Sequence, residues 1–559
     1  MNIQHAIILL VSVFFATLSY GQDKGTFSGG FQSNANFFIR DSLIGAANIP
    51  QYDRQLYGAE AWLNLGYRRD GYSAGIRFDL FNNSNRLDPN NSYTDQGIGR
   101  WYIAKQMEKL GVTVGYIYNQ IGSGSIFRAY EQRPQLIDNA LVGAQLTYQV
   151  GEEWQATVFT GRQRDLFETF DSVIKGGKFE GFVSLGEESP INLAPGIGFV
   201  NRTLDDITMN RVIGIVKDYI PKERFKPTYN VYLGSIYNTL TYKNFSWYFE
   251  AAYKSQDVFN DPMALIEGPN GSRRPGKYRR DDGNMVYTSL SFAKNKLGIT
   301  VEGKRTENFN FRVDPTLARN FGLVNFLPPM NRVNTYRLTA RYSPATQDLS
   351  ELAVQVDLKY RVKKNFNVNI NFSNITDLSG DLQLYRELYL ESIYKIKRTW
   401  RITSGVQFLT YNQEIYEVKP EVPLVNTVVP YFDILYKIDR KKSVRFEGQY
   451  MFIGDDEKKG LKQDYGDWVF GLLEYNIAPH WSFVASDMFN IDPGTNAPSD
   501  ESGEKLSLHY PRFDVFYKNG NNRYGLSYIK QVEGIVCTGG ICRLEPAFSG
   551  YQFSVNSTF

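Results

Sequence analysis

Apolar and polar residues alternate along most of this chain with a period of two. The clearest example runs from Leu352 to Phe372, where two alternating stretches flank a turn at residues 363–364. A period of two places successive side chains on opposite faces of a β-strand. Each alternating stretch is roughly 10 residues long and has one apolar and one polar face, which is typical of strands that cross a bilayer at a tilt. The pattern therefore predicts long antiparallel β-hairpins.

The connections between these stretches alternate between short turns and long loops. This alternation predicts about 22 strands, with a range of about 20 to 26. Two regions leave the count open: residues 163–228, read mainly as a long loop, and residues 331–343, which also read as a strand. Another long loop is expected at residues 257–283. The short turns fall at residues 69–70, 108–109, 151–152, 243–244, 294–295, 363–364, 396–397, 440–441, 478–479 and 519–520.

The last ten residues, Gly550 to Phe559, form one more alternating stretch. The closing strand of a β-barrel must pair with the first strand and present its outer face to lipid. The stretch resembles the C-terminal signal of bacterial outer-membrane β-barrels, which ends in Phe and is read by the barrel-assembly machinery. The alternative is an edge strand of a soluble β-sandwich. The four residues of the expected signal share one parity: Tyr551, Phe553, Val555 and Phe559.

The fold class that follows is all-β, a transmembrane antiparallel β-barrel with short periplasmic turns and long extracellular loops. Residues 1–21 predict a signal peptide, because Ala6 to Leu18 is apolar and small residues precede Gln22. A single N-terminal membrane helix is the alternative. Residues 22–559 then form one barrel domain, which is exported to the bacterial outer membrane.

Composition agrees with a barrel. The mean hydropathy is −0.37, and half of each barrel strand is expected to face a polar lumen. The chain holds 38 Tyr, 38 Phe and 7 Trp, residues that form girdles at membrane interfaces. The net charge of +3 gives no support for a nucleic-acid partner.

The sequence offers little for catalysis. Of the three histidines, His5 belongs to the predicted signal, and neither His480 nor His509 lies near a nucleophile motif. The sequence holds no glycine-rich phosphate loop, zinc motif or EF-hand. A calcium site in the polar residues 82–85 and 88–95 is the alternative to a solvated loop there, but the ligand spacing matches no known calcium loop. We therefore expect no enzymatic activity, no cofactor and no metal site.

The two cysteines, Cys537 and Cys542, lie in the segment CTGGIC. In an oxidising compartment, cysteines this close in sequence are expected to form a local disulfide. A redox switch is the alternative.

Residues 122–139 look least like a solvated loop. Apolar residues such as Phe127 and Ile137 alternate there with charged ones. Apolar side chains need a surface to cover, and the barrel mouth is the nearest large one. We expect this segment to fold inward, with Arg128, Glu131 and Arg133 as ligand-binding or pore-constricting residues paired to the wall.

The whole mature chain, and residues 122–139 in particular, resemble an uncharacterised family of large, porin-like outer-membrane β-barrel proteins of Bacteroidota. The high Tyr and Asn content and the Gly21-Gln22 cleavage site agree with this resemblance. The resemblance implies an outer-membrane barrel and assigns no activity or binding residues.

Two functions remain open. One is a porin-like passage for small solutes, because a barrel of about 22 strands encloses a wide lumen unless it is plugged. The other is a non-conducting subunit of an outer-membrane secretion, assembly or uptake complex. The expected partners are the lipid bilayer, lipopolysaccharide, the barrel-assembly machinery, and other outer-membrane proteins or lipoproteins.

Overall fold

The computed structural model describes residues 25–559, apart from residues 90, 136, 187–190, 268–272, 347–349 and 539–540, and apart from the side chains of residues 134, 535–538, 541 and 542. The predicted signal peptide, residues 1–21, lies outside the described residues.

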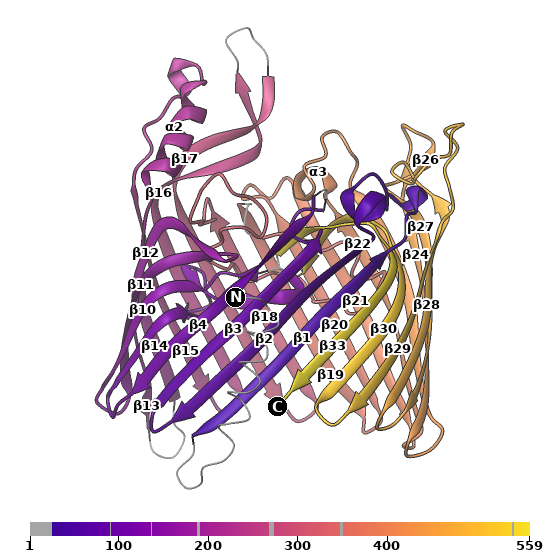
Figure 1. Ribbon diagram of the computed structural model, residues 1–559, viewed down its shortest axis with the longest axis horizontal. Helices are drawn as coiled ribbons and strands as arrows, with labels where there is room; N and C mark the ends of the chain where they lie inside the picture. Colours follow the sequence, from indigo (N-terminus) through magenta and orange to yellow (C-terminus); the bar gives the residue numbers. More distant parts are fainter. Residues whose placement is uncertain are drawn as a thin grey trace, which may run out of the picture.

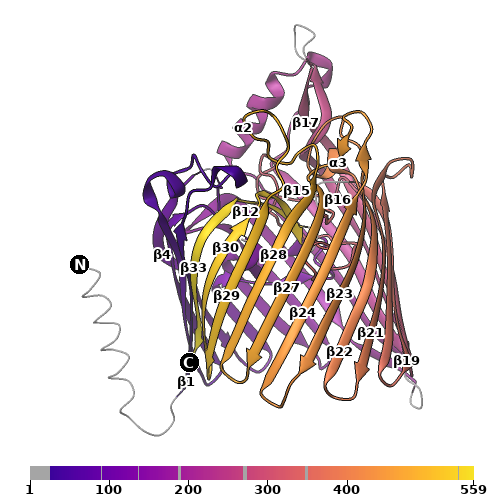
Figure 2. The same cartoon turned by 90° about the vertical axis from the view of Figure 1, so that its right-hand side faces the viewer.

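The strands form a closed antiparallel barrel of 24 strands. Closure brings the two ends of the chain together, because β1 (Thr26–Phe38) pairs with β2 (Tyr57–Arg69) on one side and β33 (Phe548–Thr558) on the other. The short β13 (Val183–Leu185) continues β12 (Glu168–Gly181), and both pair with β14 (Ile191–Thr203). The C-terminus lies at the end of the barrel that carries the short turns, and the long loops gather at the opposite end (Figures 1 and 2).

The other strands of the wall follow in chain order: β3 (Tyr72–Ser84), β4 (Tyr93–Gln106), β5 (Leu110–Ile117), β10 (Leu141–Val150), β11 (Trp154–Asp165), β15 (Asn230–Tyr242), β16 (Phe245–Glu267), β17 (Arg273–Lys294), β18 (Leu297–Glu307), β19 (Glu351–Lys363), β20 (Phe366–Thr376), β21 (Gln383–Ile396), β22 (Trp400–Tyr411), β23 (Val425–Lys437), β24 (Lys442–Ile453), β27 (Gly466–Ile477), β28 (Trp481–Pro493), β29 (His509–Asn519) and β30 (Asn522–Gln531). Short strands pair within the loops: β6 (Gln120–Ile121) with β7 (Phe127–Arg128), β8 (Glu131–Gln132) with β9 (Ile137–Asp138), β25 (Asp455–Asp456) with β26 (Leu461–Lys462), and β31 (Gly534–Thr538) with β32 (Ile541–Glu545).

The helices are few and lie in the loops. They are η2 (Ser42–Ile44), η3 (Gln51–Gln55), η4 (Arg133–Gln135), α2 (Asp206–Lys217), η5 (Pro221–Glu223) and α3 (Gln413–Tyr416). Asp205 caps α2 by accepting a hydrogen bond from the backbone N–H of Thr208 at 2.8 Å. The buried Val212 and Val216 of α2 pack against Val258 of β16. In the part of the chain that the structure describes, no helix has the length and apolar character needed to span a membrane.

The ten predicted short turns all fall between paired strands, but the strand number differs from the expected 22. Two of the strands, β12 and β14, lie within residues 163–228, which were read mainly as a loop. Residues 257–283 belong largely to β16 and β17, which rise as a hairpin above the other loops (Figure 1). Register shifts between Lys254 and Asp257 and between Asp261 and Leu265 break the alternation there, which explains why the expected loop at residues 257–283 is instead the outer part of these two strands.

The two faces of the wall have the polarity that the alternation predicts. Large apolar side chains cover the outside, among them Val158, Ile236 and Phe513, which are 55 %, 58 % and 53 % exposed. The inner face carries buried polar and charged side chains, including Glu60 and Glu387. The barrel therefore has its apolar face outside and its polar face inside, which is the reverse of a soluble β-sandwich.

The interior is filled in part by two connections, which we call the first inner loop (residues 118–140) and the second inner segment (residues 308–350). The two pack together, since the backbone N–H of Arg128 donates to the carbonyl oxygen of Val324 at 2.9 Å. The second inner segment also contacts opposite parts of the wall. Arg202 of β14 donates to the carbonyl oxygen of Arg312 at 2.7 Å, and the backbone N–H of Leu338 donates to Gln449 of β24 at 2.8 Å. It therefore crosses the barrel interior.

Residues 331–343 belong to this second inner segment and form no strand, which corrects the expectation. Their backbone groups are used differently: the carbonyl oxygen of Thr339 accepts from the Gln407 side chain of β22 at 3.0 Å. Backbone groups that bind side chains of the wall are not available for hydrogen bonds between strands, so this segment is not a strand of the sheet.

The C-terminal strand closes the barrel as predicted. The backbone N–H of Phe559 donates to the carbonyl oxygen of Gly29 at 3.0 Å, and the N–H of Gly29 donates back to Phe559 at 2.7 Å. Tyr551 and Phe553 are exposed on the outer face. The role of these residues as an assembly signal stays a prediction.

Candidate functional site

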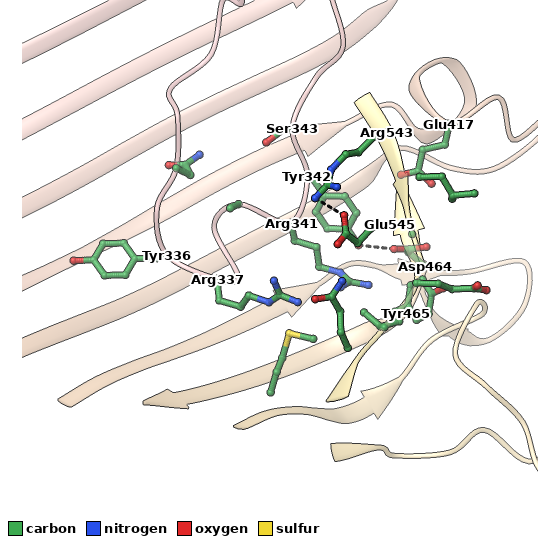
Figure 3. Close-up of a pocket in the computed structure, with 18 of the residues that line it drawn as sticks. Tyr336, Arg337, Arg341, Tyr342, Ser343, Glu417, Asp464, Tyr465, Arg543 and Glu545 are labelled. Carbon is green, nitrogen blue, oxygen red and sulfur yellow. Dashed lines mark hydrogen bonds and ion pairs between the residues drawn. The ribbon is translucent and has the colours of Figure 1, made fainter. Parts of the chain in front are cut away.

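A turn in the second inner segment holds the first part of the candidate site. The backbone N–H of Ala340 donates to the carbonyl oxygen of Tyr336 at 3.0 Å, and the N–H of Arg341 donates to that of Leu338 at 3.2 Å. These bonds wind residues 336–341 into a helical turn. Residues four apart in such a turn lie on the same side, so Arg337 and Arg341 point in a common direction (Figure 3).

Side chains of the wall fix the other side of this turn. Gln449 of β24 accepts from the backbone of Leu338, as described above. The hydroxyl of Tyr336 donates to Asp433 of β23 at 3.2 Å. Before the turn, the side-chain amide of Asn334 donates to Glu387 of β21 at 2.9 Å. These bonds hold the turn against β21–β24.

A cavity of about 700 Å³ lies beside the two arginines. Its volume falls within the range of ligand sites, about 300 to 1,000 Å³. The second inner segment provides part of its lining, and the hairpin of β31 and β32 provides another part (Figure 3). Its charged lining residues are Arg332, Arg337, Arg341, Glu417, Lys419, Asp464, Glu533, Arg543 and Glu545.

Three of the four carboxylates of the cavity are hydrogen-bonded or ion-paired. Asp464 accepts a hydrogen bond from the hydroxyl of Tyr342 at 2.7 Å. Glu417 is 2.6 Å from the ammonium group of Lys419, and Glu545 forms an ion pair with Arg543. The remaining carboxylate, Glu533, lies against Gly45 of the loop between β1 and β2.

The two arginines of the turn have no such carboxylate partner. Arg341 lies over aromatic rings, with its guanidinium carbon 4.9 Å from the ring centre of Tyr465 and 4.8 Å from that of Trp468. Among the described residues, Arg337 forms no hydrogen bond or ion pair, and its side chain is exposed to the cavity.

The surroundings of these groups change their pKa values. Burial, followed by the positive charges of Arg341 and Arg512, lowers the pKa of Arg337 below its usual 12.5. Burial alone would raise the pKa of Asp464, but the charge of Arg341 and the hydrogen bond from Tyr342 hold it below its usual value. The site thus combines a positive potential at Arg337 with a carboxylate that is kept ionised.

A second cavity of about 310 Å³ adjoins the first, because Gln531 and Glu545 line both. Its remaining lining includes the inner face of β1, with Gln32 and Asn34. Together the two cavities leave open space along the wall formed by β30, β33 and β1.

The predicted residues of the first inner loop lie close to the wall. Glu131 accepts from Arg77 of β3 at 2.7 Å and from Arg133 at 2.6 Å. Arg133 also donates to Gln32 of β1 at 2.8 Å and lines the second cavity. The guanidinium carbon of Arg128 lies 4.2 Å from the ring centre of Tyr130. These three residues are outside the first cavity, and their role in ligand binding or constriction stays a prediction.

Neither described histidine lines either cavity. The Nδ1 atom of His480 lies 2.7 Å from the carbonyl oxygen of Lys518, near a short turn. His509 pairs with Asp487 at 2.6 Å, and both side chains are exposed. His509 shares the parity of Phe513 and thus the outer face of β29. Within the described residues, no group of His, Cys, Asp and Glu has the arrangement of a metal site.

The predicted disulfide falls on side chains outside the described part of the structure. The backbone places Cys537 opposite Cys542 in the hairpin of β31 and β32.

For this pair we expect intact-mass analysis to find both cysteines unreactive toward an alkylating agent until a reductant is added. Alkylation of both without reductant would contradict the prediction. Because the bridge would close a very short loop, its removal should change the stability of the barrel little.

A family model with the description "Family of unknown function (DUF6029)" matches residues 1–559. This chain belongs to the DUF6029 family. No curated protein matches the sequence of this DUF6029 chain. The origin in Bacteroidota stays a prediction.

Solved structures of large outer-membrane barrels are similar to this DUF6029 chain in overall form. The translocation pore of the P pilus usher PapC matches with a TM-score of 0.40 and 8 % identity, over 95 % of this chain and 99 % of the usher chain. The siderophore receptor PirA from Pseudomonas aeruginosa matches with a TM-score of 0.37 and 7 % identity, over 97 % and 81 %. The outer membrane transporter YddB from Escherichia coli matches with a TM-score of 0.39 and 7 % identity, over 96 % of this chain and 81 % of the transporter chain. Such low values carry no argument about function.

The sequence pattern missed the cavity and its arginines. One signal was present: residues 331–343 broke the even strand count that a barrel requires. A segment with Arg332, Arg337 and Arg341 that could not be placed in the wall was a candidate for the interior.

Proposed function

We propose that this protein is a bacterial outer-membrane barrel that forms a porin-like, selective passage for small solutes and has no enzymatic activity. The apolar outer face supports placement in a bilayer, because side chains such as Ile236 and Leu526 would otherwise meet water over a large area. The lipid bilayer, lipopolysaccharide and the barrel-assembly machinery are its proposed partners.

The observation that carries the proposal is the pair of adjoining cavities inside the barrel. The two inner connections fill part of the lumen, while the cavities leave space with polar side chains along β30, β33 and β1. A narrow path lined by side chains selects solutes by size and charge. An unobstructed lumen would select by size alone.

The proposal is tested by reconstituting the purified protein into planar bilayers and recording single-channel currents. Discrete conductance steps are expected, and heat-denatured protein in the same detergent serves as the control. Folded barrels that remain silent over many insertions would reject the passage.

The alternative is a non-conducting subunit of an outer-membrane complex, and one observation favours it. The hairpin of β16 and β17 rises above the other loops together with α2 (Figure 2). The side chains of Ile207 and Ile213 on α2 are 66 % and 45 % exposed. Large apolar side chains that are exposed on a helix above the barrel favour a contact with another protein. Silent barrels that co-purify with a stoichiometric partner under mild detergent would support this alternative.

A further inference from the structure

We propose that the larger cavity binds a small organic anion whose carboxylate or phosphate group is held by Arg337 and Arg341. This inference rests on the proposed passage and names the class of solute that would use it.

The first argument is the state of Arg337. A guanidinium group has five N–H donors in a fixed plane that fits a carboxylate or phosphate with two parallel hydrogen bonds. Among the described residues nothing accepts from Arg337, and its side chain is exposed to the cavity. Its donors are therefore available to a solute that enters the cavity.

The second argument is the placement of the two charges. The helical turn directs Arg337 and Arg341 to the same side, so their charges repel each other (Figure 3). The lowered pKa of Arg337 reflects burial together with the charges of Arg341 and Arg512. An anion between the guanidinium groups would relieve this repulsion.

The third argument is that the carboxylates of the cavity do not compete for this position. The negative charge of Glu545 raises the pKa of Arg337, but this carboxylate already forms an ion pair with Arg543. Asp464 is held by the hydroxyl of Tyr342. An incoming anion thus meets Arg337, which has no ion-pair partner among the described residues, beside Arg341, whose charge Asp464 partly offsets.

The remainder of the lining suits the polar body of such a solute. Thr335, Ser343 and Gln531 offer hydroxyl and amide groups, and Tyr465 offers an aromatic ring. A cavity of about 700 Å³ has room for a sugar acid or a sugar phosphate.

Binding is measured by calorimetry on the purified protein in detergent, with glucuronate, glucose 6-phosphate and glucose as probes. We expect at least one of the two anions to bind more tightly than glucose. Preference for glucuronate would identify a carboxylate as the recognised group, and preference for glucose 6-phosphate would identify a phosphate. Equal binding of all three sugars, or no binding of any, would overturn the inference.

The variant Arg337→Gln should weaken anion binding roughly 10- to 100-fold, the effect of losing one hydrogen-bonded charge. It should fold normally, because Arg337 has no partner in the described protein that would be left unsatisfied. Arg319→Gln is the matched control, since Arg319 is an exposed residue of the same segment that does not line the cavity. Equal affinities of the two variants would also overturn the inference.

The binding assay needs no current, so it separates this inference from the proposed passage. Anion binding by a barrel that is silent in bilayers would support the site and reject the passage. A conducting barrel without anion binding would reject the site alone. In a conducting barrel, the reversal potential in a KCl gradient should indicate anion preference, and this preference should fall in Arg337→Gln.

Discussion

Replacing residues 330–343 with a short Gly/Ser linker is expected to raise the single-channel conductance several-fold over that of the intact protein. These residues carry the turn that crosses the interior, and removing them would join the large cavity to the rest of the lumen. The excision is feasible because its flanks are already close: the hydroxyl of Thr346 donates to the carbonyl oxygen of Leu327 at 3.2 Å. Strand pairing is unaffected, since β18 and β19 pair directly.

The matched control replaces residues 457–460, an exposed tip between β25 and β26, with the same linker. This variant should conduct as the intact protein does. Both variants must show the altered gel mobility on boiling that marks a folded barrel. An unchanged conductance in a folded 330–343 variant would contradict the role of this segment in narrowing the passage.

The substitution Asp79→Ala is expected to lower the free energy of unfolding by about 3 kcal/mol, the lower end of the range for breaking a buried charge pair. Asp79 is fully buried on β3 and accepts from Arg77 at 2.6 and 2.9 Å and from Arg164 at 2.9 Å. The substitution removes the carboxylate that balances the charges of two buried guanidinium groups, those of Arg77 and Arg164. Asp138 and Glu131 remain as partners of Arg77, which keeps the loss from being larger.

Urea unfolding in detergent, followed by tryptophan fluorescence, measures this loss. Asp171→Ala is the matched control, because its ion pair with Arg162 at 3.2 Å is exposed on both sides. Exposed pairs contribute only about 0–1 kcal/mol. Similar losses in the two variants would mean that the buried network does not stabilise the wall.

The wall of the barrel was predictable because its physical signal is local. Strands such as residues 352–362 alternate strictly, since one face meets the polar interior and the other the apolar outside. The closing strand could be recognised from the parity of Tyr551 and Phe553. The pattern does not predict the outer parts of β16 and β17, within residues 257–283, because register shifts interrupt the alternation there.

The interior could not be predicted in the same way, because its contacts join residues far apart in the chain. Arg77 and Glu131 meet across 54 positions, and the backbone of Leu338 meets Gln449 across 111. No periodicity records such contacts. The mixed apolar and charged composition of residues 122–139 indicates a segment that needs a surface to pack on, but it does not indicate which surface.

The path of the second inner segment across the barrel has a consequence for the order of folding. The segment is anchored to Arg202 of β14, which precedes it in the chain, and to Gln449 of β24, which follows it. It therefore cannot reach its final position until most of the C-terminal strands have joined the sheet. Contacts of such long sequence separation form slowly. Until then its apolar residues, Phe309 and Phe311 among them, lack part of their native cover, and apolar surface exposed in this way is prone to aggregation.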